Sequence, residues 1–158
     1  MASYAPSTRQ RIADIRLGLR VDRTAQAIPV TTDVLFTVTG GRIALLGLIG
    51  EITSLFDATA TTLLVTCNAD TGADTVLSIA SAALNDREAG VCVALPATAG
   101  TGLIDSVTEG AVILGANPVW AVAAGSIDIT VGGGANAGLM KWTLFYVPID
   151  SGAYVTAA

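Results

Sequence analysis

Apolar and polar residues alternate with a period of two in short segments along most of the chain. In the clearest segment, near the C-terminal end, four large apolar side chains fall on one face and Pro148 ends the pattern. These side chains are Met140, Trp142, Leu144 and Tyr146. Side chains alternate across a β-strand with the same period, so residues 139–147 are predicted to form a strand with one buried face.

Further strands are expected at short spacing, separated by clusters of glycine, asparagine, aspartate and proline that favour turns. They cover residues 34–39, 43–49, 61–67, 75–80, 91–95, 111–114, 119–123 and 127–131. Residues 80–84 are the only segment that suits a helical turn. This pattern predicts an all-β fold, an antiparallel β-sandwich or jelly roll of about eight to ten strands.

The strongest hairpin signal lies at Gly40 and Gly41, which can adopt the positive φ angles of a tight turn between two apolar segments. The segment after the turn, 43–49, is apolar on both faces, so it needs a cover on two sides, from a second sheet or from another subunit. We therefore expect an oligomer contact on this strand. Its residues are Ile43, Leu45, Leu46, Leu48 and Ile49.

The N-terminal segment differs from the rest of the chain in charge. Residues 1–23 hold five arginines and two aspartates, a balance of +3, and the remaining residues hold three basic and eleven acidic side chains, a balance of −8. Residues 15–21 alternate strictly, which favours a strand, and Gly18 weakens a helix. We expect residues 1–29 to form an extended basic arm, whose basic face is solvated or pairs with an acidic protein surface.

Composition narrows the class of protein. A chain of 158 residues can bury one core of its own, which we place at residues 30–150, with a short tail at 151–158. Only 13% of the residues are charged and 52% are hydrophobic, which is typical of a subunit that buries surface in an oligomer. Five arginines make a small footprint for nucleic acid, and no apolar run reaches the roughly 18 residues of a membrane span. We expect neither kind of partner.

The sequence contains no histidine, which closes the commonest routes to an enzyme. Ser-His-Asp and Cys-His catalysis and histidine metal sites all need that residue. Cys67 and Cys92 lie in apolar runs and are expected to be small buried side chains, although a disulfide between them stays open. We therefore expect no catalytic residue, no metal and no cofactor.

Two weaker signals have simple structural explanations. Residues 68–74 carry oxygen side chains at the spacing of a calcium loop, but the closing glutamate is missing, which favours a solvated turn. Trp120 lies in an apolar run and is expected to belong to the core. If Trp120 were exposed, or if Asp70 held calcium, the chain could instead be a carbohydrate-binding jelly roll.

Three blocks of the sequence resemble small virion proteins of tailed bacteriophages. They are VDRTAQAIP at 21–29, LFTVTGGRIALLGLIGEIT at 35–53 and KWTLFYVPIDSGA at 141–153. A β-rich body with an N-terminal arm is most similar, within that class, to capsid decoration or cement proteins. The resemblance supplies no active-site residues. It implies that the arm binds a partner, and the expected contact residues are Arg9, Arg11, Arg16, Arg20, Arg23, Ile15, Leu17 and Leu19.

The resemblance implies a structural role. It leads us to expect a homo-oligomer, with a trimer favoured, that is made in the bacterial cytoplasm and sits on the outer surface of the virion. There it would stabilise the capsid by bridging major capsid protein subunits. A tail or baseplate component would share the same composition and remains an alternative.

Overall fold

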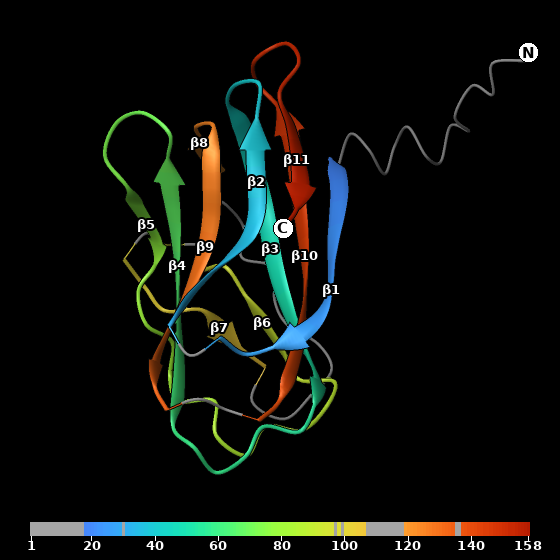
Figure 1. Ribbon diagram of the computed structural model, residues 1–158, viewed down its shortest axis with the longest axis vertical. Coiled ribbons are helices and arrows are strands. Elements are labelled where there is room, and N and C mark those ends of the chain that lie inside the picture. The colour runs from blue at the N-terminus through green and yellow to red at the C-terminus, as the bar shows by residue number, and fades with distance from the viewer. Residues whose placement is uncertain (1–17, 30, 97, 99, 107–118, 135–136) are drawn as a thin grey trace, which may run out of the picture.

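The computed structural model of the chain describes residues 18–29, 31–96, 98, 100–106, 119–134 and 137–158. In this part of the chain there are eleven strands and no helix. The strands form two antiparallel sheets that pack face to face (Figure 1). The expectation of an all-β sandwich is confirmed.

The first sheet has six strands, in the order β1-β10-β3-β6-β7, and β8 pairs with β3 beside β6. Its strands are β1 (Leu19–Ala27), β3 (Ile43–Ser54), β6 (Cys92–Ala94), β7 (Ile104–Asp105), β8 (Trp120–Val122) and β10 (Leu139–Pro148). The second sheet has the order β11-β2-β9-β4-β5. Its strands are β2 (Thr32–Thr39), β4 (Thr61–Ala69), β5 (Thr75–Ser78), β9 (Gly125–Gly133) and β11 (Tyr154–Ala157).

The core lies between the inner faces of the two sheets. On β10 the four predicted residues are all buried: Met140, Trp142, Leu144 and Tyr146. They face the apolar residues of the second sheet, among them Phe36, Leu63 and Ile127, which are fully buried. Burial of one apolar face on each sheet is the main stabilising contribution in such a sandwich.

The predicted hairpin at Gly40 and Gly41 is wrong in one respect. The tight turn exists and both glycines have positive φ, but β2 pairs with β9 and β3 pairs with β10, so the turn carries the chain from one sheet to the other. A Cβ on Gly40 would lie 2.5 Å from the carbonyl oxygen of Gly152, in the turn between β10 and β11. The local turn signal was correct, but it does not determine which strands pair.

The second turn, between β10 and β11, also crosses between the sheets and is tied to the first. The backbone N–H of Arg42 donates a hydrogen bond to Oδ2 of Asp150 (2.8 Å), and its guanidinium donates to the same carboxylate. These hydrogen bonds from Arg42 lower the pKa of Asp150 below its usual value. Asp150 therefore holds two corners of the sandwich together.

Both ends of the predicted domain are placed wrongly. Strand β1, which falls inside the expected arm, pairs with β10, and β11, which falls inside the expected tail, pairs with β2. The sandwich therefore includes residues 19–27 and 154–157. Residues 80–84 form no helical turn, because Ser81 and Leu84 donate their backbone N–H groups to carbonyl oxygens of β4. The expected strand at 111–114 lies outside the described residues.

Arg23 closes the side of the sandwich where β1 and β11 meet. Its side chain is only 6% exposed, pairs with the carboxylate of Asp33 on β2, and donates from Nε to the backbone oxygen of Ala158 (3.2 Å). One cation thus joins a strand of the first sheet to two segments of the second. A buried charge needs such partners, because its desolvation is costly.

We expect Arg23→Ala to destabilise the fold by about 2 kcal/mol, less than a fully buried pair would cost because Asp33 is 39% exposed and can be hydrated. Urea unfolding at neutral pH measures the change. Arg20→Ala is the matched control on the same strand: Arg20 and Asp22 are both more than half exposed, and the loss should be about 0.5 kcal/mol or less. Equal losses for the two variants would contradict the role assigned to Arg23.

The hydrogen bonds from Arg42 to Asp150 should make the stability of the fold depend on pH. The folded-state pKa of Asp150 lies below the ordinary value of 3.8, so its stabilising effect is complete above pH 3.8 and is lost as the pH falls below that value. Asp150→Asn should therefore lower the thermal midpoint at pH 7, and the difference from the wild type should shrink below pH 3.8. In an Arg42→Gln background the same substitution should have a smaller effect at pH 7, because only the backbone N–H of residue 42 still donates to the carboxylate. A difference that is constant with pH would contradict this.

Candidate functional site

Most of the expected contact residues of the arm lie outside the described residues: Arg9, Arg11, Ile15, Arg16 and Leu17. The remaining three are on β1. Leu19 is 47% exposed and Arg20 is exposed, so both are accessible to a partner. Arg23 is not accessible, because it is buried against Asp33, and its assignment as a partner-binding residue is wrong.

The exposed face of β1 carries a small polar cluster. Asp22 accepts hydrogen bonds from the hydroxyl of Thr143 (2.7 Å) and from Arg20 (2.9 Å). Burial tends to raise the pKa of Asp22, but these hydrogen bonds outweigh it and the pKa lies below the usual value. At neutral pH Asp22 is therefore ionised and forms an ion pair with Arg20 at this edge of the sheet.

The expected oligomer strand, β3, lies in the middle of the first sheet and divides its residues between two faces. Ile43, Leu45 and Leu48 are at most 1% exposed and belong to the core, so their assignment to an oligomer contact is wrong. The second sheet supplies the cover that the sequence required on this face. Leu46 and Ile49 are half-buried on the outer face and stay candidates for a subunit contact.

The outer face of the first sheet continues this apolar surface onto β10. Phe145 pairs with Gly47 and is half-buried, and Val147 pairs with Ala44 and is 40% exposed. The ion pair of Lys141 with Glu51 lies farther along the same two strands. Phe145 and Val147 were not predicted as contact residues, although their alternation with the buried residues of β10 places them on the outer face.

The outer face of the second sheet is different. Its exposed large apolar side chains, Val76 and Tyr154, lie on the two edge strands, β5 and β11. Threonines occupy many of the other outward positions, and the hydroxyl groups of Thr32 and Thr130 lie 3.0 Å apart on neighbouring strands. The other outward threonines are Thr37, Thr39, Thr62, Thr66 and Thr156. Hydroxyl groups can hydrogen-bond with water, so this face is suited to solvent and the apolar face of the first sheet is better suited to a partner.

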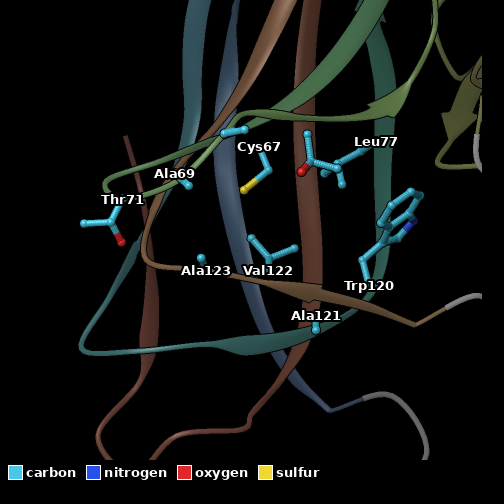
Figure 2. Close-up of a pocket in the computed structure, with 10 residues that line it drawn as sticks. Cys67, Ala69, Thr71, Leu77, Trp120, Ala121, Val122 and Ala123 are labelled. Atoms are coloured by element: carbon cyan, nitrogen blue, oxygen red, sulfur yellow. The ribbon is translucent and has the colours of Figure 1, made fainter.

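A cavity of about 140 Å³ lies between the β4–β5 hairpin and β8 (Figure 2). Strand β5 lies on the side of the sandwich away from β1 (Figure 1). Cys67 and Val122 point toward each other across it, and Trp120 forms one wall. Trp120 packs against the core, as expected, although its ring is half-buried and its buried Nε1 has no hydrogen-bond partner among the described residues. The cavity was not predicted, because its walls are far apart in the sequence.

Neither a metal site nor a membrane span is found in the part of the chain that the structure describes. No group of three or more acidic or cysteine side chains there is placed to hold a metal ion. Asp70 and Asp74 lie in the exposed turn that joins β4 to β5. Nor does this part contain a helix with the length and apolarity that a membrane crossing would need.

No family model, no curated protein and no solved structure matches this chain.

Both cysteines are free thiols, and burial raises the pKa of each. Cys67 is buried in β4, whereas Cys92 is half-buried on the outer face of β6 opposite Glu51. Alkylation of the folded chain should therefore modify Cys92 at least roughly tenfold faster than Cys67. Cys67→Ser and Cys92→Ser variants identify the two rates, and both thiols should react alike in denaturant. If no thiol reacts before reduction, the two residues form a disulfide.

Proposed function

We propose that this chain is a structural virion protein that decorates a bacteriophage capsid and stabilises it by bridging major capsid protein subunits. The apolar outer face of the first sheet is the observation that carries the proposal. Leu46, Ile49, Phe145 and Val147 provide an apolar surface there, with Lys141 and Glu51 nearby. An apolar centre beside polar groups is typical of a protein-protein interface.

The strand pairing supports a finer fold assignment within this proposal, a jelly roll. In an eight-stranded jelly roll a long hairpin is rolled up, so the first strand pairs with the last, the second with the second-last, and so on inward. The pairs β1–β10, β2–β9, β3–β6 and β4–β5 follow this order, with the short strands β7, β8 and β11 added. Jelly rolls are common in viral capsids and also in lectins, so the fold supports the proposal without deciding it.

Bridging can give strong binding from contacts that are individually modest, because their affinities combine within one complex. A subunit that touches two neighbouring capsid proteins makes its second contact within one complex, where the effective concentration is high. The sheet face provides one contact, and the exposed Leu19 and Arg20 of β1 provide another. No step of this mechanism requires a catalytic group or a cofactor.

The decisive experiment is to count copies of this chain in gradient-purified particles of the phage that encodes it, relative to the major capsid protein. We expect hundreds of copies, comparable to the capsid protein. A few copies to a few dozen would instead place the chain in the tail, the baseplate or a single vertex. Its absence from particles would refute any virion role and leave a carbohydrate-binding module as the alternative.

A surface variant tests which face binds. Val147→Glu places a carboxylate on the apolar face, at an exposed position where the fold should tolerate it. We expect it to weaken binding to particles that lack the protein by roughly tenfold or more, because the charge must be desolvated in the contact. Thr37→Glu, exposed on the opposite sheet, is the matched control and should bind normally. Equal binding of both variants would mean that this face is not the contact.

A further inference from the structure

Among the described strands, one sheet edge is unpaired on the side of the sandwich opposite β1. Strand β5 is the last strand of the second sheet, and among the described residues no strand pairs with its outer edge over Thr75–Ser78. Pairing resumes only beyond the strand, where Ile79 bridges to Gly102. Unpaired backbone N–H and C=O groups along such an edge can bind an added strand.

The cavity described above opens beside this edge. Thr71, Ala73, Thr75 and Leu77 line one side of it, and β8 lines the other. Its volume of about 140 Å³ is close to that of an apolar cavity that accommodates a benzene-sized group, so it can take one aliphatic side chain. A strand added to β5 would point alternate side chains into the space between the two sheets.

The surroundings of this edge combine negative charge with exposed apolar groups. Asp70 and Asp74 are exposed, and within the described part of the chain neither carboxylate has a hydrogen-bond or ion-pair partner. Val76 and Ile79 are 46% and 47% exposed. A complementary ligand is therefore an extended segment in which aliphatic residues alternate with basic ones.

Residues 1–17 of the chain have this character. They contain three arginines and one aspartate, a balance of +2, and the total of −5 leaves −7 for the rest of the chain. Ile15 and Leu17 alternate with Arg16, and Arg9 and Arg11 precede them. Seventeen extended residues span up to about 56 Å, which is enough to reach a neighbouring molecule.

We propose that residues 9–17 of one copy add a strand to the β5 edge of a second copy, with Ile15 in the cavity and Arg9 and Arg11 paired with Asp70 and Asp74. The segment leads into β1, which lies on the opposite side of the molecule from β5 (Figure 1). Donor and acceptor are therefore different surfaces, and the contact is head-to-tail, closing into a ring such as a trimer. This inference goes beyond the proposed function, because it concerns contacts between copies and holds on or off a capsid.

Sedimentation velocity of the full-length chain over a range of concentrations tests the proposal. We expect the wild type to form a closed oligomer and Ile15→Asp to be monomeric. Asp70→Asn with Asp74→Asn should weaken association about tenfold, because two ion pairs are lost. Asp86→Asn with Glu88→Gln makes the same change in charge in another exposed loop and should leave association unchanged. Thermal midpoints check that each variant is folded.

Mixing two defective variants distinguishes strand exchange from other modes of association. Ile15→Asp keeps the acceptor edge, and Ala73→Trp blocks the mouth of the cavity but keeps the donor segment. Each variant alone should be monomeric, and an equimolar mixture should form dimers and nothing larger, since one intact donor and acceptor remain. A monomeric wild type, an Ile15→Asp variant that still assembles, or a mixture that stays monomeric would each overturn the proposal. Capsid binding by Val147→Glu is scored separately, so either proposal can fail alone.

Discussion

A sandwich of two open sheets has two open sides, and the treatment of these sides governs the rest of this structure. The inner faces bury the apolar residues of β3, β10, β4 and β9, but at each side the core would meet solvent. On the β1 side, Arg23 fills the gap and is held by Asp33 and the carbonyl oxygen of Ala158. On the β5 side no such group is found among the described residues, and a cavity remains. This asymmetry makes one side closed and the other suited to a partner.

The two turns that cross between the sheets, at Gly40–Gly41 and between β10 and β11, also hold the two sheets together. A chain that crosses twice between the sheets near one end of the sandwich must bring two tight turns together, and glycine at 40 allows the backbones to approach. Asp150 then satisfies the backbone N–H of Arg42 that the turn leaves exposed. Because Tyr146 also accepts a hydrogen bond from the N–H of Val155, the last strand is tied to both sheets. The C-terminal residues are thus part of the domain, because the turn after β10 places β11 beside β2.

The sequence could predict what depends on local alternation and could not predict what depends on distant partners. The buried face of β10 was evident because Trp142 and its neighbours follow a strict period of two. The sequence places β1 in the arm because its alternation would fit a strand in any sheet. Only its pairing with β10 shows that it belongs to the first sheet of the same chain. The apolar run at β3 correctly required two covers. The pattern could not reveal that the second sheet supplies one of these covers. Nor could it reveal that, of the five expected contact residues, only Leu46 and Ile49 lie on the outer face.

The charges of the arm favour one sheet edge as its binding site, whereas its apolar pattern would fit several edges. An alternating segment with no net charge could pair with many sheet edges, including its own, and would risk uncontrolled aggregation. Arginines on the segment favour the β5 edge over the others, because Asp70 and Asp74 beside it have no charged partner among the described residues. Like charges or unpaired charges elsewhere would oppose docking. The charges on β1 already pair with each other as Arg20 and Asp22, so that edge offers a basic segment little attraction. Selectivity between the β1 and β5 edges thus follows from which carboxylates have a partner among the described residues and which do not.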